Sequence, residues 1–477
     1  MNILLITLDQ FRGDCLSCAG HPVVRTPNLD ELAQNGVRFS RHYSQAAPCG
    51  PGRASLYTGL YQAQHRVVGN GTPLDRRFDN IAWAARRAGY RPTLFGYTDQ
   101  AIDPRDVTDP ADPRLSSYEG VLPGFEVGLD LPSETPTAWL DDLKRKGRGE
   151  LSAHDALASE DRRPASDSMA AFVTDRLTGW IAEQPGPWFA HLSHLRPHPP
   201  FCAAGEFAGR YDPQSVPEPI APSPDRHPLH VGLSRPGLMG APDAAEQRRM
   251  AAQYFGMISE VDHQLGRLWQ ALKDNGLWDD TFILVTSDHG EQLGDHGLMQ
   301  KGGFFEASYH VPLVIRDPRQ MASAGRVVEA FTENVDVAPT LCVAMGLEGS
   351  DQANGRSLMP FISGTQPKTW RTAAHWEYDW RTSHIGKPVV AEDRRGETQN
   401  LAVLRRDDAA YVQFGDGSFL AFDLASDPTW RTPLTEPGAI LELAQEMLVW
   451  RSRHADRTLT GFLTRDGGVG RAPETQY

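Results

Sequence analysis

Short apolar runs bounded by turn residues recur along the chain up to residue 370, and helical patterns lie between them. Uninterrupted apolar runs are typical of strands that are buried on both faces of a sheet. Strands that alternate with helices therefore predict an α/β domain with a large, mostly parallel central sheet between helices. The predicted strands cover residues 2–8, 91–97, 188–192, 281–286 and 311–315, and the predicted helices cover residues 28–36, 80–88, 167–183 and 244–275.

The pattern changes beyond residue 370, where short alternating runs are joined by tight turns. Alternation of apolar and polar positions predicts an antiparallel sheet with one face toward the core. A last helix is expected to pack on this sheet. The predicted strands cover residues 402–405, 410–414 and 419–423, and the predicted helix covers residues 440–454.

These patterns predict two domains, a large α/β domain at residues 1–370 and a small α+β domain at residues 371–477. Within the first domain, residues 131–168 and 203–243 are polar or rich in proline and glycine. Segments of that composition usually run over the surface and often carry function. We expect both to be surface excursions that could cover the functional site.

Composition narrows the class of protein. The chain has 477 residues, 40% of them hydrophobic, and a formal net charge of −14, which argues against nucleic acid as a partner. No apolar run approaches the ~20 residues that span a bilayer, so no membrane partner is expected. Five cysteines, an odd number, do not indicate a disulfide framework, and the first apolar run lacks the features of a secretory signal. A cytoplasmic protein is therefore expected.

The first candidate for chemistry is a cysteine directly before a Pro-Gly turn, in the segment 49–59, which reads CGPGRASLYTG. Proline is favoured at the start of a helix, so Cys49 is expected at a helix N-terminus, where unpaired N–H groups favour negative charge. Arg53, one turn along, could hold residue 49 or an anion bound there. A thiolate nucleophile would need a neighbouring imidazole, and a merely buried cysteine is the plain alternative.

Polar side chains follow two of the predicted strands. Asp9 and Gln10 come after the first strand, and Asp288 and His289 follow the strand at 281–286. Ligands of open α/β sheets bind outside the carboxyl ends of the strands. These residues, with an oxygen from position 49, would offer a divalent cation hard ligands and one imidazole. The alternative is that each aspartate caps the next helix.

The run C-x-P-x-R, followed by a hydrophobic stretch and T-G, resembles the signature of the formylglycine-dependent sulfatases of the alkaline phosphatase superfamily. The resemblance extends to SDHGEQLGDHG at residues 287–297 and to RPHPP at 196–200. It implies an alkaline-phosphatase-like sandwich, and a formylglycine-generating enzyme that oxidises Cys49 to an aldehyde whose hydrate is the nucleophile. In that family a lysine contacts the transferred group and a histidine assists the leaving group, roles that fall to Lys301 and His198.

Two departures from the usual sulfatase pattern refine the expectation. Typical sulfatases have a second aspartate where this chain has Gln10, and an asparagine where it has His289. An added nitrogen ligand suits manganese better than calcium, with magnesium as a further alternative. A Lys-x-His pair of the family is replaced by GYTD at residues 96–99. Fewer positive charges should favour singly charged diesters and phosphonate monoesters.

The resemblance is greatest to the branch of phosphonate monoester hydrolases and phosphodiesterases. The shared features include Asn70, the Gly-Tyr-Thr run, RPHPP and the segment HADRTLT at 454–460. They imply substrate-binding roles for Asn70 and Tyr97. Asp99 stands where threonine would be expected, and it could either repel an anionic substrate or act as a base in product release.

The sequence thus predicts a metal-dependent hydrolase of phosphonate monoesters and phosphodiesters with activity on sulfate esters, and an arylsulfatase is the alternative. A serine- or threonine-dependent phosphomutase is disfavoured by the cysteine in the attacking position, and a pure binding protein would not need that nucleophile. The expected partners are a small anionic ester and a second copy of the chain, as a homodimer or homotetramer. The expected catalytic residues are Cys49, Arg53, Asp99, His198 and Lys301.

Overall fold

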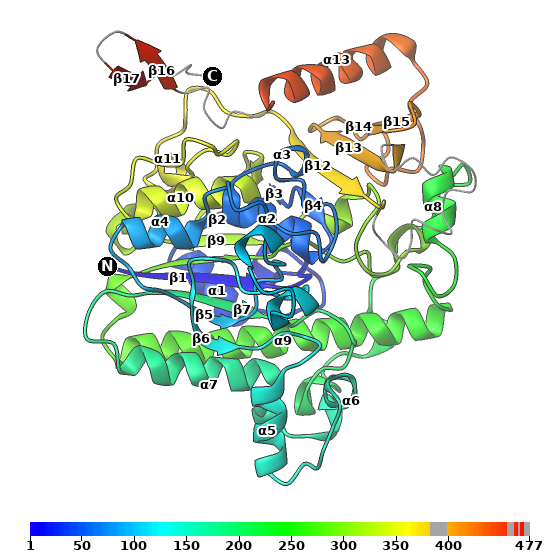
Figure 1. The fold of residues 1–477 in the computed structure, drawn as a ribbon. Coiled ribbons are helices and arrows are strands. Elements are labelled where there is room, and N and C mark those ends of the chain that lie inside the picture. Colours follow the sequence, from blue (N-terminus) through cyan, green and yellow to red (C-terminus); the bar gives the residue numbers. More distant parts are fainter. Residues whose placement is uncertain (382–397, 456–461, 466–467, 472–477) are drawn as a thin grey trace.

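A sheet of eight strands forms the centre of the computed structural model, which describes residues 1–381 and 398–455 and the backbone of residues 462–465 and 468–471. The strand order is β10-β2-β9-β8-β1-β7-β5-β6 (Figure 1). Neighbours pair in parallel except β9, which is antiparallel to β2 and β8. The bounds are β1 Asn2–Leu8, β2 Val37–Phe39, β5 Pro92–Gly96, β6 Glu126–Asp130, β7 Phe189–His194, β8 Thr281–Thr286, β9 Leu313–Arg316 and β10 Arg326–Val328.

The central strands β1, β7 and β8 are buried along their whole length. Leu5 of β1 lies between His191 of β7 and Leu284 of β8, so side chains of the three strands form rows across the sheet. Such burial explains the uninterrupted apolar runs from which these strands were predicted. The three-residue strands β2 and β10 carried no such pattern and were not predicted.

Helices cover both faces of the sheet, as predicted (Figure 1). The long helices α7 and α9 lie along one face with α1, and α2, α4, α10 and α11 lie on the other. Their bounds are α1 Pro27–Gln34, α2 Cys49–Thr58, α4 Ile81–Arg87, α7 Met169–Ala182, α9 Ala244–Asp274, α10 Val337–Ala344 and α11 Met359–Ile362. Asp243 begins α9 by accepting hydrogen bonds from the N–H groups of Ala245 and Glu246.

A second sheet of five strands has the order β15-β14-β13-β12-β4. The strands β13 to β15 form the predicted antiparallel meander, and α13 packs on it through Leu443, Met447 and Trp450. The strand β12, which was not predicted, extends the meander by pairing antiparallel with β13. The fifth strand, β4, comes from the N-terminal part of the chain and pairs in parallel with β12. The bounds are β4 Ala46–Ala47, β12 Ala374–Asp379, β13 Asn400–Arg405, β14 Ala409–Phe414, β15 Phe419–Asp423 and α13 Pro437–Arg453.

The two polar excursions contain short helices, and the first projects below the sheet with α5 and α6 (Figure 1).

The five cysteines are all free. Within the described ranges, no helix is long and apolar enough to cross a membrane. Part of the segment 454–460 lies outside the described residues. The remaining elements are β3 His42–Tyr43, β11 Thr332–Glu333, β16 Phe462–Arg465, β17 Gly468–Arg471, α3 Gln62–His65, α5 Thr137–Arg145, α6 Ala153–Leu157 and α8 Pro228–Leu233.

Candidate active site

The helix α2 begins at Cys49, as the Pro-Gly turn predicts. It packs directly on the segment after β8, because a Cβ atom on Gly52 would lie 2.6 Å from the carbonyl oxygen of Asp288. Only glycine allows this approach. At the same end of the helix, Asn70 accepts a hydrogen bond of 2.9 Å from the N–H of Gly50. Cys49 is thereby fixed between the helix and the ends of the central strands.

Three side chains that the sequence placed at strand ends come together here with Cys49, which it placed at a helix N-terminus. The potential ligand atoms of Asp9, Cys49, Asp288 and His289 all lie within 4.8 Å of one another, and all four residues are buried. The thiol sulfur is 3.3 Å from Nε2 of His289 and 3.8 Å from Oδ1 of Asp9. The parallel strands β8 and β1 are neighbours, so the two aspartates that follow them meet at one edge of the sheet.

The imidazole of His289 is oriented by its own backbone. Nδ1 lies 3.0 Å from the carbonyl oxygen of Gly290, which only accepts hydrogen bonds, so Nδ1 carries the proton. Nε2 is then left with a lone pair toward Cys49 and the two carboxylates. Burial also lowers the pKa of His289 to about 3, which keeps the ring neutral. A neutral imidazole held in this tautomer is what a metal ion requires of a histidine ligand.

The carboxylates of Asp9 and Asp288 both accept hydrogen bonds from the guanidinium of Arg53. Arg53 donates to Oδ2 of Asp288 at 2.9 Å and to Oδ2 of Asp9 at 3.2 Å. Burial and the charge of Asp9 nevertheless raise the pKa of Asp288. Two buried carboxylates beside one guanidinium carry an excess negative charge that a divalent cation would neutralise. Two carboxylates and one imidazole therefore fit a metal ion at this position.

Arg53 and Tyr97 face the carboxylates. The guanidinium also donates to the hydroxyl of Ser193 at 2.8 Å and to the carbonyl of Tyr97 at 3.1 Å, and the residue is fully buried. The ring of Tyr97 lies 4.2 Å from the guanidinium carbon, and its hydroxyl donates to Asp9. Both residues therefore hold Asp9 in place. We expect them to act on a substrate through that carboxylate.

Lys301, His198 and Gln10 form a second group beside the first. The ammonium of Lys301 lies 2.6 Å from Oε1 of Gln10 and 2.7 Å from Nε2 of His198. The amide oxygen of Gln10 is thus occupied by Lys301, and its amide nitrogen donates to Glu291. Gln10 could offer that oxygen to a cation once Lys301 has turned to another acceptor.

The tautomer of His198 also follows from its contacts. Nδ1 lies 2.8 Å from the carbonyl oxygen of Pro199, so Nδ1 carries the proton and Nε2 accepts from Lys301. Burial and the charge of Lys301 lower the pKa of His198 to about 3. The imidazole is neutral at rest, and its acceptor nitrogen points toward the side chain that would contact an anion.

Asp99 is buried beside the start of α2. Its backbone has a left-handed conformation, with φ of 53°, and is tied to α2 because Gln100 donates from one amide nitrogen to the carbonyls of Gly50 and Asp99. One carboxyl oxygen of Asp99 has no hydrogen-bond partner. Burial raises the pKa of Asp99 to about 8. The segment that packs on the start of α2 thus carries a buried carboxyl with a free oxygen.

The pKa of the Cys49 thiol is raised well above its usual value, by burial first and then by the charge of Asp9. Thiolate chemistry needs the opposite shift. The unmodified cysteine is thus a neutral thiol and a poor nucleophile. The raised pKa disfavours the thiolate interpretation, although an imidazole lies next to the sulfur.

Sequence reasoning missed the residues that hold these groups in place. Glu291 accepts from Gln10 and, through its other oxygen, from the N–H groups of Leu293 at 2.8 Å and Gln300 at 2.6 Å. It therefore fixes the segment that ends in Lys301. The sequence signal was its place directly after the Asp-His-Gly run. Ser44, which donates to the carbonyl of Asp288, lies in a loop without any pattern.

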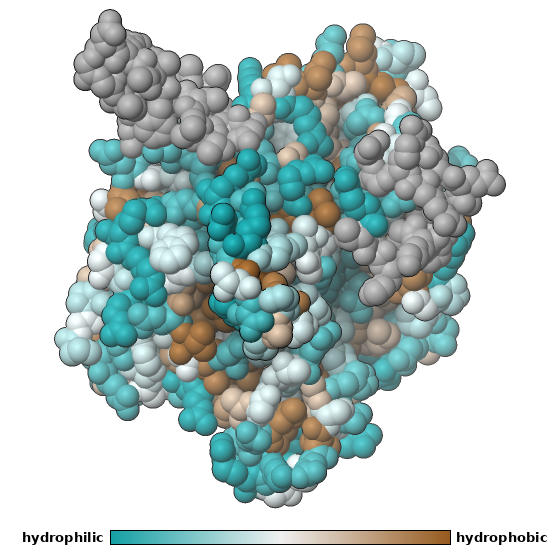
Figure 2. All heavy atoms as spheres, in the orientation of Figure 1, coloured by the Kyte–Doolittle hydropathy of each residue, from teal (hydrophilic) through white to brown (hydrophobic). Residues whose placement is uncertain are grey.

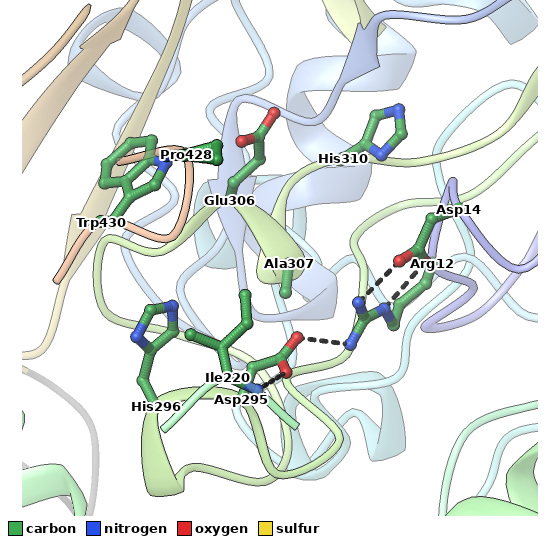
Figure 3. Close-up of a pocket in the computed structure, with 10 residues that line it drawn as sticks. All are labelled: Arg12, Asp14, Ile220, Asp295, His296, Glu306, Ala307, His310, Pro428 and Trp430. Atoms are coloured by element: carbon green, nitrogen blue, oxygen red, sulfur yellow. Dashed lines mark hydrogen bonds and ion pairs between the residues drawn. The ribbon is translucent and has the colours of Figure 1, made fainter. Parts of the chain in front are cut away.

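A separate cavity of about 150 Å³ is lined by residues that include Arg12, Asp295 and Trp430 (Figure 3). The guanidinium of Arg12 at its wall is paired with Asp14 at 2.7 Å and with Asp295 at 2.9 Å. None of the residues that line it belongs to the group around Cys49. Of the residues that contact that group or lie beside it, Asn70 is exposed, and His198 and Lys301 are partly exposed.

Comparison with known proteins adds independent information. The sulfatase family model matches residues 1–347. The multifunctional alkaline phosphatase superfamily protein PehA from Trinickia caryophylli is 37% identical over 512 residues, which cover 98% of each chain. An arylsulfatase from Clostridium perfringens is 28% identical over 456 residues, which cover 91% of this chain and 90% of the relative.

Solved structures show the same architecture. The phosphonate monoester hydrolase of Agrobacterium radiobacter superposes with a TM-score of 0.91 and is 43% identical, with 99% of each chain covered. The phosphonate monoester hydrolase SpPMH from Silicibacter pomeroyi superposes with a TM-score of 0.88 and is 36% identical, again with 99% of each chain covered. Both similarities include the central sheet and the smaller C-terminal sheet.

Proposed function

This chain belongs to the sulfatase family, and on that basis we propose that it hydrolyses phosphonate monoesters and phosphodiesters and also acts on sulfate esters. It is an ester hydrolase of the alkaline phosphatase superfamily and has the fold of that superfamily. The observation that carries the proposal is the buried group of Asp9, Cys49, Asp288 and His289. This group offers one residue that can become a nucleophile and three that can hold a cation beside it.

The nucleophile would be the oxidised side chain of residue 49. A neutral, buried thiol attacks poorly, whereas an aldehyde hydrate at the same position would present hydroxyl groups to the ester. Family membership supports conversion of Cys49 by a formylglycine-generating enzyme. The second hydroxyl of a hydrate would later release the transferred group without attack of water on a crowded centre.

Asp9, Asp288 and His289 would hold one divalent cation, and Gln10 could add its amide oxygen. Carboxylate oxygens combined with one imidazole favour manganese over calcium or magnesium. When bound, such a cation lowers the pKa of a hydroxyl that it contacts and so supplies a nucleophile at neutral pH. Arg53 and Tyr97 keep the carboxylates pointed at this position through the contacts described above.

The anionic ester would be bound by Lys301 and Asn70. Lys301 is a partly exposed cation, and its ammonium can leave Gln10 for a nonbridging oxygen. The side-chain oxygen of Asn70 accepts from the N–H of Gly50, so the side-chain NH₂ group of Asn70 can donate to the ester. Asp99 adds a carboxyl beside them. One lysine suits a singly charged ester better than a doubly charged one, and Asp99 would strengthen this preference when its carboxyl is ionised.

His198 would protonate the departing oxygen. At rest its Nε2 accepts from Lys301, whose charge contributes to its lowered pKa. Binding of an anion draws Lys301 away and places negative charge near the ring, and both changes raise the pKa of His198. The imidazole can then carry a proton at Nε2, next to the ester, and give it to the leaving oxygen. Asp99 is the candidate base for the release of the product.

Rates on three substrates of matched leaving group test the proposal. We expect kcat/KM for a phenyl phosphonate monoester and a phosphodiester to exceed that for an aryl sulfate. The arylsulfatase alternative draws support from the relative of Clostridium perfringens, and a dominant sulfate rate would establish it instead. Peptide mass at position 49 and metal analysis of the same preparation complete the test. Full activity with an unmodified thiol, or after exhaustive chelation, would refute the mechanism.

We further propose that the protein is a homodimer or homotetramer that associates through α13. The outward face of this helix exposes Leu441, Leu448 and Val449, whose exposed fractions are 59%, 65% and 45%. Figure 2 shows hydrophobic side chains gathered where α13 lies in Figure 1. Exposed large apolar side chains on one helix are typical of a surface that binds a partner.

A further inference from the structure

A single guanidinium ties together the loop that carries His198. Arg196, which is 1% exposed, donates from one terminal nitrogen to the carbonyl oxygens of His198 at 2.8 Å and Pro200 at 2.9 Å. These two carbonyls lie on either side of Pro199, whose own carbonyl accepts from the imidazole of His198. The position of Arg196 therefore decides where the backbone of this loop lies, and with it the ring.

The other side of this guanidinium is fixed by a carboxylate from the first polar excursion. Arg196 donates from Nε to Oε2 of Glu160 at 3.0 Å and from its second terminal nitrogen to the same oxygen. The remaining oxygen of Glu160 accepts from the N–H of Met169 at 2.9 Å, at the first residue of α7. Glu160 thus joins the loop of His198 to the start of a long helix that packs on the central sheet.

A second buried carboxyl group, that of Glu260, lies near Glu160. Glu260 of α9 accepts from the N–H of Ala204 at 3.2 Å, and its other oxygen has no partner. Burial and the charge of Glu160 raise the pKa of Glu260. Glu160, and not Glu260, accepts from the guanidinium of Arg196 and forms the ion pair with it.

Stability alone does not account for a charged pair in this place. Glu160 and Arg196 are each about 1% exposed, and removing both charges from water costs about as much as their attraction returns. Apolar residues of similar volume would stabilise the fold at least as well. What only the charged pair provides is a guanidinium of fixed orientation with donors left for two backbone carbonyls.

We propose that Glu160 is a positioning residue that holds His198 in register with the departing oxygen, through Arg196 and the loop carbonyls. The inference rests on the proposed function, in which His198 gives the proton to that oxygen. Glu160 does not touch the substrate. Its contribution is the fixed geometry that proton transfer over hydrogen-bond distance requires.

A positioning role makes a prediction that a purely structural role does not. Proton donation matters most for esters with poor leaving groups and little for esters such as 4-nitrophenyl. Loss of folded protein would instead lower the rates on all substrates by the same factor. The informative quantity is therefore the slope of log kcat/KM against the pKa of the leaving group.

The experiment measures this slope for aryl phosphonate monoesters with the wild type, E160Q, H198A and the control E183Q, whose site is an exposed position at the end of α7. We expect E160Q to lose about tenfold on phenyl esters with little loss on 4-nitrophenyl esters. H198A should show a steeper slope still, and E183Q the slope of the wild type. A slope of E160Q equal to that of the wild type, with H198A steeper, would overturn the inference.

Two variants distinguish a failure of this inference from a failure of the proposed role of His198 or of folding. If H198A itself keeps the slope of the wild type, the proposed role of His198 fails, and the inference falls with it. If E160Q does not fold, the double variant E160L/R196M replaces the pair by apolar side chains and removes the donors to the loop. A folded double variant should again show the steeper slope, and an unchanged slope would refute the positioning role.

Discussion

The Nε2 atom of His289 lies 3.3 Å from the sulfur of Cys49, although 240 residues separate the two in the chain. The approach is possible because α2 begins where β8 ends, with Gly52 against the carbonyl of Asp288. Because Nδ1 carries the proton, Nε2 has a free lone pair, and this lone pair faces residue 49. The residue that we propose as the source of the nucleophile and a residue that can ligate a metal are thus held together before any ligand binds.

Replacing Cys49 by alanine should abolish turnover and leave the fold intact, because the small side chain of Cys49 contributes little to the buried volume of α2. We expect kcat/KM to fall on the order of 10⁴-fold or more on every substrate. Circular dichroism and thermal unfolding of the variant serve as the control for folding. Activity that survives the substitution would mean that another residue attacks the ester.

Replacing His289 by asparagine should change the metal preference. The substitution exchanges the one nitrogen ligand for an amide oxygen, which suits calcium better than manganese. We expect the purified variant to retain less manganese after dialysis than the wild type, by elemental analysis, and to gain relatively more activity from added calcium. His154→Asn, at an exposed position, is the matched control. Equal manganese content in both proteins would exclude His289 as a ligand.

The sequence predicted the central site because the ends of β1 and β8 are marked by uninterrupted apolar runs. Residues directly after such runs must lie at one edge of a parallel sheet, so Asp9 and Asp288 could be paired before the structure was known. The position of Cys49 followed from the Pro-Gly turn at the start of α2. In each case a local pattern determined where the side chain lies.

Other parts of the site leave no local pattern. The strand before α2 is β4, and its two residues show no periodicity. It nevertheless pairs with β12 and so connects the start of α2 to the C-terminal sheet. The pairing of Glu160 with Arg196 joins two segments whose charges look like surface charges in the sequence. Arg53 was expected on the substrate side, and only the structure shows its donors on the carboxylates. Such contacts depend on the tertiary packing of distant segments.

Glu333 should make the protein sensitive to acid. It is buried, its oxygens accept from Tyr61 at 2.6 Å and from the N–H of His375 at 2.8 Å, and Arg371 lies 3.3 Å away. Although burial acts in the opposite direction, the charge of Arg371, the side chain of His375 and the hydrogen bond from Tyr61 lower the pKa of Glu333 from 4.5 to about 2. The stabilisation is therefore present above pH 4.5 and is lost as the pH falls toward 2.

The variant Glu333→Gln tests this linkage. A shift of this size corresponds to about 3 kcal/mol of unfolding free energy near neutral pH. Urea unfolding at pH 7 should show a loss of that order, and the difference from the wild type should shrink between pH 4.5 and pH 2. Glu329→Gln, at an exposed position, should change stability little. A pH-independent loss in Glu333→Gln would mean that packing, not charge, sets its contribution.

The face of α13 predicts the effect of a charge on assembly. Leu448 is 65% exposed, so glutamate at this position should not disturb the fold. If α13 is covered by a second copy, a buried glutamate would cost several kcal/mol and shift the protein to a smaller species in light scattering. Leu115→Glu, at another exposed leucine, is the control. Identical masses for the wild type and Leu448→Glu would remove α13 from the interface.

Asp99 predicts how substrate preference depends on pH. Burial raises the pKa of Asp99 to about 8, so its carboxyl is neutral below that pH and negatively charged above it. A negative charge on Asp99 repels a doubly charged monoester more than a singly charged diester. A difference of about 1–2 kcal/mol in this repulsion would change the rate about tenfold. The ratio of diester to monoester kcat/KM should therefore rise as the pH passes 8.

Asp99→Asn keeps the shape of the neutral form and cannot ionise, so its ratio of diester to monoester rates should stay flat across pH 8. Asp99→Glu keeps the charge and is the matched comparison. If Asp99 instead acts as the base in product release, Asp99→Asn should lower kcat on both esters alike, and mass spectrometry should find the transferred group accumulating on residue 49. A rate ratio that still changes near pH 8 in Asp99→Asn would show that another group titrates there. The two roles therefore separate in one set of measurements, because repulsion changes selectivity while a missing base changes turnover.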